Sequence, residues 1–475
     1  MKQILFVASE VHPFAQTGGL AEVIGSLPQA IQAMSSDYHV AVVMPLYRLV
    51  QKQYHDRLKL IASTDVALGW RNLYCGFFKI EDAGVDYYFI DNQYYFDRDE
   101  LYGHYDDGER FAFFSKAVFS LIETLHIVPD IIHCHDWHSA MVSVYLDILY
   151  KKNGKLLDTK SVFTIHNIQY QGIFSCDILE DVLGIPSQYL PIMEYNGLVN
   201  YMKGAIVTSD LVTTVSPRYA KEIKTSQYAC GLEYITRLHP EKLEGILNGI
   251  NTRFYNPEED LSLPFTYSSI DFTGKAKNKQ DLQTTLGLTV DPSVPVLAII
   301  SRLVTQKGLN LVVDVFHEIM KLPIQIVLLG KGDDYYQEKF VELAKAYPGR
   351  VATIIAFDIN LSKRIYAGSD LFLMPSKMEP CGLSQMIACR YGTIPIVRAT
   401  GGLFDSIKDY HEKNGNGFVF KDFEANQMFD KIKEAVTLYS NYPAFQKLAK
   451  RIMTIDFSWN ASATLYIEKY NRLLK

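Results

Sequence analysis

Ile4-Leu5-Phe6-Val7-Ala8 is a short, wholly apolar and β-rich run, and Gly18-Gly19 and a helical stretch over residues 20–34 follow it. An apolar run without polar alternation predicts a central strand of a parallel sheet, buried on both faces. A strand, a glycine turn and a helix in this order form the first part of a βα unit. The start of the chain therefore predicts an α/β fold with a doubly wound sheet.

The alternation of strand and helix continues through the first half of the chain. A segment with helical periodicity lies at residues 111–125. Further apolar runs predict strands at residues 39–44, 85–90, 131–134 and 160–165.

After Asn256-Pro257 the same pattern starts again. We predict helices at residues 309–320 and 383–390, and strands at residues 294–300, 324–329, 371–374 and 394–397. The stretch 257–275 is polar, acidic and broken, as expected of a hinge or linker. A chain of 475 residues is also too long for one compact core of ordinary size. We therefore expect two Rossmann-like domains, residues 1–250 and 251–455, facing an interdomain cleft where ligands bind beyond the strand ends.

Composition excludes several classes of protein. Hydrophobic residues make up 48% and charged residues 21% of the chain, which is ordinary for a globular protein. The net charge of -6 gives no general attraction to nucleic acid or to an anionic membrane. The six cysteines form no CxxC pair, the first apolar run ends at Ser9-Glu10, and no stretch is long enough to span a bilayer. We expect a cytoplasmic protein without nucleic-acid or membrane partners.

Two clusters at predicted strand ends suit an anionic ligand. In Thr17-Gly18-Gly19-Leu20, backbone N–H groups and a helix N-terminus can approach a diphosphate, although a tight turn without a ligand is the simpler interpretation. Ser301-Arg302, followed by Gln306-Lys307-Gly308, places two cations directly after the strand that ends at Ile300. Arginine and lysine both bind phosphate, and the alternative is a solvated surface pair.

A third cluster, Glu379-Pro380-Cys381-Gly382-Leu383-Ser384, follows the predicted strand 371–374. Its carboxylate can bind sugar hydroxyls or steady an oxocarbenium-like carbon. The alternative is an acid at a helix N-terminus, which the helix dipole favours. Gly401-Gly402 follows the next strand and allows the same alternative of a simple turn.

The densest polar cluster is His133-Cys134-His135-Asp136-Trp137-His138. A metal site is one interpretation, but neighbouring residues of a strand face opposite ways, which separates the histidines. Asp136 and Trp137 suit a sugar, because a ring covers its apolar face and a carboxylate accepts from its hydroxyls. In Thr164-Ile165-His166-Asn167 the histidine is either a site residue or a satisfied core residue.

Taken together, the order and spacing of these clusters resemble those of bacterial glycogen synthases and plant starch synthases over almost the whole chain. The resemblance implies the GT-B fold and a C-terminal helix, residues 456–475, that packs back on the first domain. The motifs that carry it are Thr17-Gly18-Gly19-Leu20, His135-Asp136-Trp137-His138, Thr164-Ile165-His166-Asn167, Asn248-Gly249-Ile250, Ser301-Arg302-Leu303 with Gln306-Lys307-Gly308, Glu379-Pro380-Cys381-Gly382-Leu383 and Thr400-Gly401-Gly402-Leu403.

The resemblance also assigns roles to individual residues. It implies catalytic roles for His166, Arg302, Lys307 and Glu379. It implies donor or nucleotide binding by Gln16, Gly18, Gly19, Glu22, Phe357, Cys381, Gly382, Leu383, Ser384, Gly401 and Gly402. It implies sugar or acceptor binding by Asp136, Trp137, Asn167 and Asn248. No metal and no cofactor are implied, because the two cations neutralise the leaving diphosphate.

The implied reaction is the transfer of glucose from ADP-glucose to the non-reducing 4-OH of an α-1,4-glucan such as glycogen, with retention of anomeric configuration. UDP-glucose is the alternative donor. A sucrose- or trehalose-forming GT-B transferase is disfavoured by the motifs that begin at Thr17 and His135.

The sequence departs from the family pattern at four positions. Gln16 replaces a lysine, Glu22 an aspartate, Ala356-Phe357 a Gly-Tyr pair and Ser384 a threonine. Loss of the lysine removes a positive charge associated with donor binding. A glucan- or nucleotide-sugar-binding paralogue with little turnover is therefore the alternative hypothesis.

Overall fold

The computed structural model describes all residues from 1 to 475. The chain forms two compact units. Unit 1 comprises Met1–Asn248 and Trp459–Lys475, and unit 2 comprises Gly249–Ser458. The C-terminal helix α20 (Trp459–Leu473) therefore belongs to unit 1, although all of unit 2 precedes it in the chain.

Unit 1 is built on a nine-stranded sheet in which β1 (Lys2–Val7) is central. β1 pairs in parallel with β2 (Tyr38–Pro45) on one side and with β6 (Ile131–His135) on the other. Its residues 4–7 are buried, so the predicted central strand is confirmed. The other strands, in sheet order, are β12 (Leu243–Gly245), β11 (Leu211–Thr214) and β7 (Lys160–Ile165) beyond β6, and β5 (Val85–Asp91), β4 (Arg71–Asp82) and β3 (Lys59–Leu68) beyond β2.

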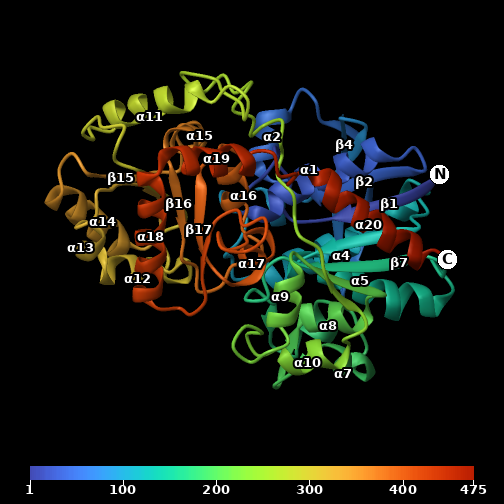
Figure 1. The fold of residues 1–475 in the computed structure, drawn as a ribbon. Coiled ribbons are helices and arrows are strands. Elements are labelled where there is room, and N and C mark those ends of the chain that lie inside the picture. The colour runs from blue at the N-terminus through green and yellow to red at the C-terminus, as the bar shows by residue number, and fades with distance from the viewer. The chain divides into compact units, whose positions relative to one another are not determined.

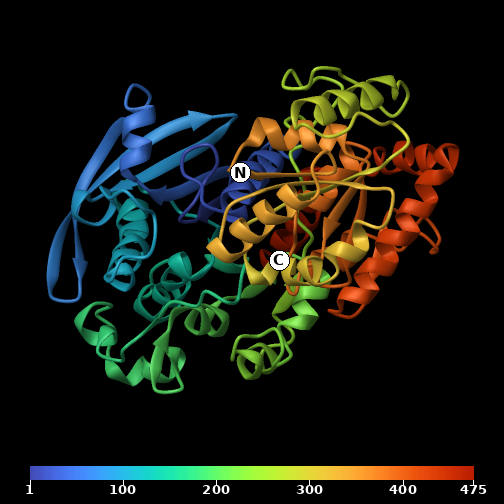
Figure 2. The ribbon, with the colours of Figure 1, turned by 90° about the vertical axis from the view of Figure 1, so that its left-hand side faces the viewer.

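The sheet ends in an antiparallel hairpin that the sequence analysis did not predict. β3 pairs antiparallel with β4, and β4 with β5; Figure 2 shows this blue hairpin extending from the sheet. Most of β3 is exposed or half-buried. A strand that is wet on one face mixes polar with apolar residues, so it lacks the continuous apolar run that marked the buried strands.

Helices cover the large sheet of unit 1. The longer ones are α1 (Gly19–Met34), α4 (Asp107–Thr124), α5 (Trp137–Tyr145), α8 (Tyr201–Thr208) and α20. Shorter helices are α2 (Arg48–Tyr54), α3 (Gln93–Phe96), α6 (Ile178–Asp181), α7 (Leu190–Met193), α9 (Pro217–Glu222) and α10 (Glu233–Leu238). A small sheet combines β8 (Ile173–Phe174), β10 (Leu198–Asn200) and β9 (Glu194–Tyr195).

Helix α20 packs against α1, and Figure 1 shows it in red beside the first blue helix and strands. Lys2 donates from Nζ to Asn471 Oδ1 at 2.9 Å, and Ser462 donates from Oγ to the carbonyl of Leu247 at 2.6 Å. The first bond joins the two ends of the chain, and the second joins α20 to the segment at which unit 1 first ends.

Unit 2 is built on a six-stranded sheet in which every pair is parallel. Its strands, in sheet order, are β15 (Val351–Ile355), β14 (Gln325–Gly330), β13 (Val296–Ile300), β16 (Leu371–Met374), β17 (Ile394–Arg398) and β18 (Phe418–Phe420). Its helices are α11 (Thr273–Thr285), α12 (Leu309–Asp314), α13 (Phe316–Ile319), α14 (Asp334–Ala346), α15 (Ile359–Gly368), α16 (Ser384–Arg390), α17 (Gly401–Ser406), α18 (Ala425–Ser440) and α19 (Tyr442–Ile452).

Two expectations for unit 2 need correction. The helix predicted at 309–320 is interrupted at Val315, whose φ of -115° and ψ of 20° end α12. The stretch predicted as a hinge or linker lies inside unit 2, where Asp260 accepts a hydrogen bond from Tyr391 Oη at 2.7 Å and lies 3.4 Å from Lys363 Nζ. One of its acidic residues, Asp260, is therefore paired within unit 2.

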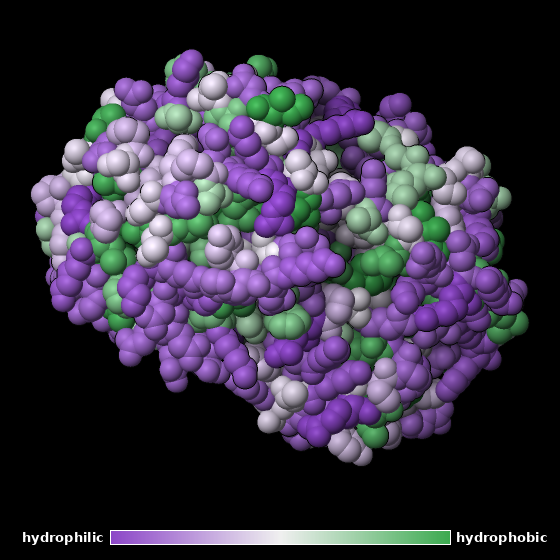
Figure 3. Space-filling model, in the orientation of Figure 1, coloured by the Kyte–Doolittle hydropathy of each residue, from purple (hydrophilic) through white to green (hydrophobic).

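Hydrophobic residues lie in small groups among hydrophilic ones on the face drawn in Figure 3. None of the helices combines the length and the apolar character needed to cross a bilayer.

Candidate active site

Parallel strands end at a common edge of each sheet, so side chains that follow them gather there. In unit 1 this edge carries Glu10 after β1, Asp136 after β6 and His166 after β7. In unit 2 it carries Arg302 after β13, Phe357 after β15 and Glu379 after β16. Because each unit is compact by itself, the two groups are described in turn.

Glu10 organises the glycine turn of unit 1. Its buried carboxylate accepts hydrogen bonds from the backbone N–H of Thr17 at 2.5 Å and of Gly18 at 3.1 Å, and from Thr17 Oγ1 at 2.7 Å. Tyr102 donates to the same carboxylate at 2.8 Å. The backbone N–H of Gly18, which the sequence suggested for a diphosphate, is therefore already paired with Glu10. Gly19 is the first residue of α1, as the predicted strand–turn–helix order requires.

Gln16 lies exposed on this turn, next to Glu22 of α1. Its amide nitrogen Nε2 donates to Glu22 Oε1 at 3.3 Å, and its oxygen lies 3.1 Å from Nδ1 of His12. Two of the positions at which the sequence departs from the family, 16 and 22, are thus in direct contact. A lysine at position 16 would meet the Glu22 carboxylate at the same place.

Asp136 adopts a conformation that is uncommon for a residue with a side chain, with φ +55°. Its Oδ1 accepts hydrogen bonds from the backbone N–H of His166 at 2.8 Å and of Asn167 at 3.4 Å, which ties the end of β6 to the end of β7. Burial raises the pKa of Asp136 to about 7, although these two hydrogen bonds act in the opposite direction. Near neutral pH its carboxyl can therefore carry or release a proton.

His166 belongs to a group of three imidazoles, with His133 and His135 of β6. His166 Nε2 lies 2.9 Å from His135 Nδ1, and the ring of His135 lies 4.1 Å from that of His133 between centroids. Burial lowers the pKa of His166 to about 3 and that of His133 and His135 well below the usual value. All three rings are therefore neutral at physiological pH.

The remaining predicted sugar-binding residues of unit 1 differ in exposure. Trp137 is buried, with its ring against Phe111 and against Gly172, so its contacts support a packing role and its contact with a sugar stays a prediction. Asn167 Oδ1 accepts from the backbone N–H of Gln169 at 3.0 Å. Asn248 is 6% exposed, and its Oδ1 has no hydrogen-bond partner in the protein. Such an oxygen is available to a ligand that brings a donor.

In unit 2 the structure joins two residues that the sequence analysis treated separately. Lys307 Nζ lies 2.7 and 2.9 Å from the two carboxylate oxygens of Glu379, and Ser376 Oγ donates to the same carboxylate at 2.9 Å. Glu379 is 7% exposed. It lies five residues before α16, so the alternative of an acid in the first turn of a helix is wrong.

Arg302 is exposed and its guanidinium has no hydrogen-bond or ion-pair partner in the protein. Of the two predicted phosphate-binding cations, one is therefore free and the other is paired with a carboxylate. A third cation, which the sequence analysis missed, is the buried Arg398 at the end of β17. It donates to the carbonyls of Ser376 and Lys377 at 3.2 and 2.7 Å and so supports the loop that carries Glu379.

Gly401 and Gly402 are needed for close packing on the Glu379 loop. A Cβ added to Gly401 would lie 1.9 Å from the carbonyl oxygen of Glu379, and one added to Gly402 would lie 2.1 Å from that of Cys381. The N–H of Gly402 is directed at the carbonyls of Glu379 and Pro380, at 3.2 and 3.1 Å. These contacts support the interpretation as a packed turn, and nucleotide binding by the two glycines stays a prediction.

Four further predicted donor-binding residues form the end of this loop, and a fifth stands alone. Cys381 is buried, Gly382 has φ +70°, Leu383 precedes α16 and Ser384 begins it, with its hydroxyl bonded to Tyr366. Phe357 follows β15 and is 82% exposed, so its ring face is open to a ligand.

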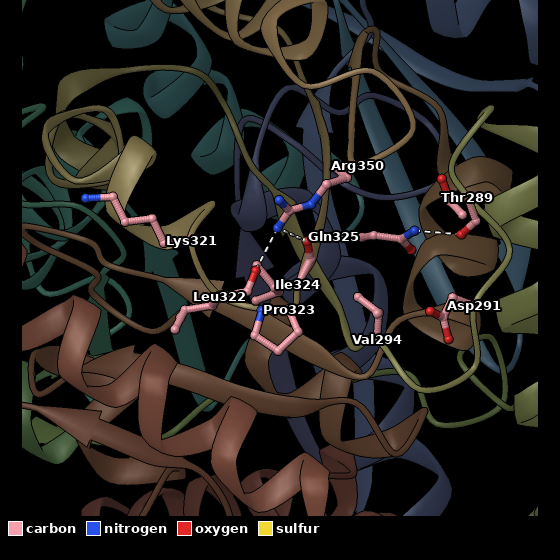
Figure 4. Close-up of a pocket in the computed structure, with 9 residues that line it drawn as sticks. All are labelled: Thr289, Asp291, Val294, Lys321, Leu322, Pro323, Ile324, Gln325 and Arg350. Atoms are coloured by element: carbon pink, nitrogen blue, oxygen red, sulfur yellow. Dashed lines mark hydrogen bonds between the residues drawn. The ribbon is translucent and has the colours of Figure 1, made fainter.

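A pocket lies at the other edge of the unit 2 sheet, where β13 and β14 begin (Figure 4). It has a volume of about 400 Å³, and none of the predicted site residues lines it. Arg350 donates to the carbonyls of Leu322 and Ile324, and Gln325 donates to that of Thr289, so the main polar groups of the pocket are already paired.

The chain holds no group of three or more His, Cys, Asp or Glu side chains arranged for a metal ion. This includes the cluster of histidines on and after β6.

Comparison with known proteins agrees with this architecture. The sequence profile of the starch synthase catalytic domain matches residues 3–238, and that of glycosyl transferases group 1 matches residues 288–452. The chain is 47% identical to glycogen synthases of Geobacillus thermodenitrificans and Geobacillus stearothermophilus, over 100% of this chain and 98% of each relative.

Among solved structures, the catalytic domain of starch synthase IV from Arabidopsis thaliana, bound to ADP and acarbose, superposes with a TM-score of 0.92 at 35% identity, over 100% of this chain and 99% of that one. A sucrose-phosphate synthase from Thermosynechococcus elongatus shares the fold, with a TM-score of 0.62 at 17% identity over 100% and 99% of the two chains.

Two Rossmann-like units with polar side chains at their strand ends define a glycosyltransferase of the GT-B fold, as the sequence predicted. The similarity along the full length is more specific than the fold. The chain belongs to the family of glycogen and starch synthases.

Proposed function

We propose that this protein is a glycogen synthase that transfers glucose from ADP-glucose to the non-reducing 4-OH of an α-1,4-glucan and retains the anomeric configuration. Similarity along the full length to glycogen synthases, at 47% identity, carries the proposal. The related starch synthase IV with bound ADP and acarbose supports an adenine nucleotide and a glucan-like sugar as ligands.

The diphosphate of the donor is bound by Arg302 and Lys307. Arg302 has no partner in the protein, so its guanidinium can turn to two phosphate oxygens at once. Lys307 keeps one N–H for a phosphate after two have been given to Glu379. Both cations favour the departure of ADP because they neutralise the charge that develops on its terminal phosphate.

The exposed ring of Phe357 is the candidate contact for the adenine base. Stacking uses the ring face, so phenylalanine can replace tyrosine there with loss of only the hydroxyl group. A uracil also stacks on such a ring. This contact therefore does not discriminate ADP-glucose from UDP-glucose.

The glucose is bound by side chains of unit 1. The neutral ring of His166, the carboxyl of Asp136 and the unpaired Oδ1 of Asn248 together offer donors and acceptors to sugar hydroxyls. Two of these groups are fixed by the fold, because Asp136 accepts from the backbone of His166 and His166 contacts His135. Fixed polar groups need little reorganisation when charge develops on the sugar.

The reaction needs no nucleophile from the protein. The bond between the anomeric carbon and the phosphate oxygen breaks, and the bond between that carbon and the acceptor 4-oxygen forms on the same face of the ring. The proton of the acceptor hydroxyl goes to a phosphate oxygen of the leaving ADP. In this proposal the carboxylate of Glu379 steadies the positive charge of the reacting carbon, and Lys307 holds the carboxylate in place.

The test follows labelled glucose from ADP-glucose or UDP-glucose into glycogen, with Arg302→Ala as the matched control. We expect label in the polymer mainly from ADP-glucose, release of that label by an enzyme specific for α-1,4 linkages, and strong loss in the control. Binding of either donor without incorporation would contradict the proposal.

That outcome would favour a second candidate, a binding paralogue with little turnover. Its support is Gln16, whose side chain is uncharged and already in contact with Glu22 and His12. Retention of Arg302, Lys307, Glu379 and His166 favours the enzyme. A cytoplasmic location and the absence of nucleic-acid and membrane partners stay predictions.

A further inference from the structure

Three buried imidazoles lie side by side under the carboxyl edge of the unit 1 sheet. His133 and His135 are two residues apart on β6 and so point to the same face of the sheet, where Phe6 of the neighbouring strand β1 contacts both rings. His166, which follows β7, extends the row towards the edge. His133 and His135 are both fully buried, whereas His166 is partly exposed.

The far end of this row is held by the C-terminal helix. Tyr470 of α20 has its hydroxyl 2.7 Å from His133 Nδ1, and Thr164 of β7 has its hydroxyl 2.6 Å from His133 Nε2. Thr164 in turn lies 2.6 Å from the hydroxyl of Thr213. Both nitrogens of His133 therefore have partners, and its ring is fixed against that of His135.

His135 differs from His133 because only one of its nitrogens has a partner. Nδ1 lies 2.9 Å from His166 Nε2, whereas Nε2 is buried without any hydrogen-bond partner. A neutral imidazole carries a single proton, so that proton is on one nitrogen or the other. The two arrangements have different consequences for His166.

If His135 carried its proton on Nε2, the structure would contain a buried N–H without an acceptor. If it carries the proton on Nδ1, the unpaired atom is an acceptor, which is the less rare of the two in folded proteins. In the second arrangement His135 donates to His166 Nε2. The proton of His166 must then be on Nδ1, and this atom has no partner in the protein and is not sealed from solvent.

We propose that His135 is a positioning residue that fixes His166 as the tautomer protonated on Nδ1, so that His166 offers an N–H donor to the sugar. The ligand atom that this donor takes is a hydroxyl oxygen of the transferred glucose, and to that extent the inference rests on the proposed function. The tautomer itself does not depend on the substrate. Tyr470 fixes the ring of His133 by a hydrogen bond, and His133 in turn fixes the ring of His135 by packing against it.

The first test uses the full chain labelled with ¹⁵N in histidine, because protonated and unprotonated ring nitrogens have widely separated shifts. His166→Gln assigns the His166 signals by their loss. We expect protonated Nδ1 and unprotonated Nε2 in both His166 and His135. A protonated Nε2 in either residue overturns the proposal, whether or not the protein makes glucan.

The second test compares two replacements of His135 in the complete enzyme. His135→Phe keeps an aromatic ring on Phe6 but removes the donor, and we expect kcat to fall about tenfold with a mixture of His166 tautomers. His135→Asn offers an amide N–H near the place of Nδ1–H and should restore most of kcat and the single tautomer. Equal kcat in both variants overturns the positioning role.

His138→Phe is the matched control, because His138 is also buried but its ring contacts Tyr102, Phe111 and Trp137 and no other histidine. It should leave the His166 nitrogen shifts unchanged. A change of tautomer in this variant as large as in His135→Phe would mean that general loosening moves the proton, and would overturn the specific role of His135. If the wild-type chain shows the expected shifts but makes no polymer, the proposed function fails and the tautomer assignment stands.

Discussion

Replacing Lys307 by alanine should reduce both catalysis and stability, whereas replacing Arg302 should reduce catalysis alone. Lys307 gives two hydrogen bonds to Glu379, a carboxylate that is 7% exposed and keeps only the hydroxyl of Ser376 after the change. Arg302 is exposed and has no partner in the protein. Loss of Lys307 therefore leaves the buried Glu379 carboxylate without its cation, whereas loss of Arg302 leaves no group of the protein unpaired.

The magnitude follows from the geometry of the pair. Removing one partner of a buried ion pair costs about 3–5 kcal/mol. The Lys307 side chain is 18% exposed, so water can reach the site in the variant and we expect the lower limit, about 3 kcal/mol. In a cooperative unit of the size of unit 2, Gly249–Ser458, a loss of this size lowers the melting temperature by roughly 6–12 °C. Loss of a hydrogen bond to a charged phosphate lowers kcat/KM by about tenfold to a hundredfold in either variant.

The assay combines thermal unfolding with initial rates from ADP-glucose and glycogen. The variant Lys307→Ala with Glu379→Gln removes both charges, and we expect it to regain most of the lost stability but none of the activity. A melting temperature for Lys307→Ala within about a degree of wild type would refute the stabilising role of the pair. Near-normal kcat/KM in Arg302→Ala or Lys307→Ala would remove that residue from the diphosphate site.

Three further predictions concern position 16, metal ions and the protonation of Asp136. Gln16→Lys should raise kcat by about tenfold or more, because a charge is added beside the departing phosphate. The measurement is kcat at saturating glycogen. An unchanged or lower value would mean that contact with Glu22 neutralises the lysine or that the site works with glutamine. Activity should survive exhaustive EDTA treatment, and loss that added Mg²⁺ or Zn²⁺ restores would contradict neutralisation of the diphosphate by Arg302 and Lys307. The pKa of Asp136 is raised in the folded state from 3.8 to about 7, so folding binds a proton between these values and the free energy of unfolding falls as pH rises through this range. Asp136→Asn should remove this pH dependence. Measured by urea unfolding, the free energy of unfolding of the variant should gain about 2–3 kcal/mol relative to that of the wild type between pH 5 and pH 8. An equal pH dependence in both proteins would show that Asp136 does not bind the proton.

The buried strands could be predicted because a strand covered on both faces is largely apolar. Val85–Asp91, Ile131–His135 and Lys160–Ile165 were found by this signal, with ends displaced by at most one residue. Prediction failed where one face is wet, as in Lys59–Leu68, and where a break within an apolar periodicity depends on backbone angles, as at Val315.

Candidate site residues could be found where they follow a strand that the sequence reveals. Glu10 follows the first strand in the same way as Asp136 follows the β6 strand, and that signal could have found it. Arg398 directly follows the predicted strand 394–397, so the same signal could have found it, whereas no signal of this kind marks Tyr470. Arg398 acts through carbonyls of a distant loop, and Tyr470 lies on a helix that the intervening unit separates from the rest of unit 1.

The sequence by itself determined the α/β class, the two Rossmann-like sheets and the family. These properties depend on local apolar runs, on glycines at turns and on the order of short motifs, all of which are present in the unfolded chain. The resemblance also predicted the C-terminal helix that returns to the first domain.

Only the tertiary structure decided how the predicted residues pair. It joined Lys307 to Glu379, closed the glycine turn on Glu10, and aligned His166 with His135 and His133 under the C-terminal helix. Hydrogen bonds and ion pairs act over a few ångströms between side chains far apart in the sequence, and burial sets the pKa of each group through everything packed around it. Charge state and tautomer therefore follow from the fold and cannot be read from the motifs.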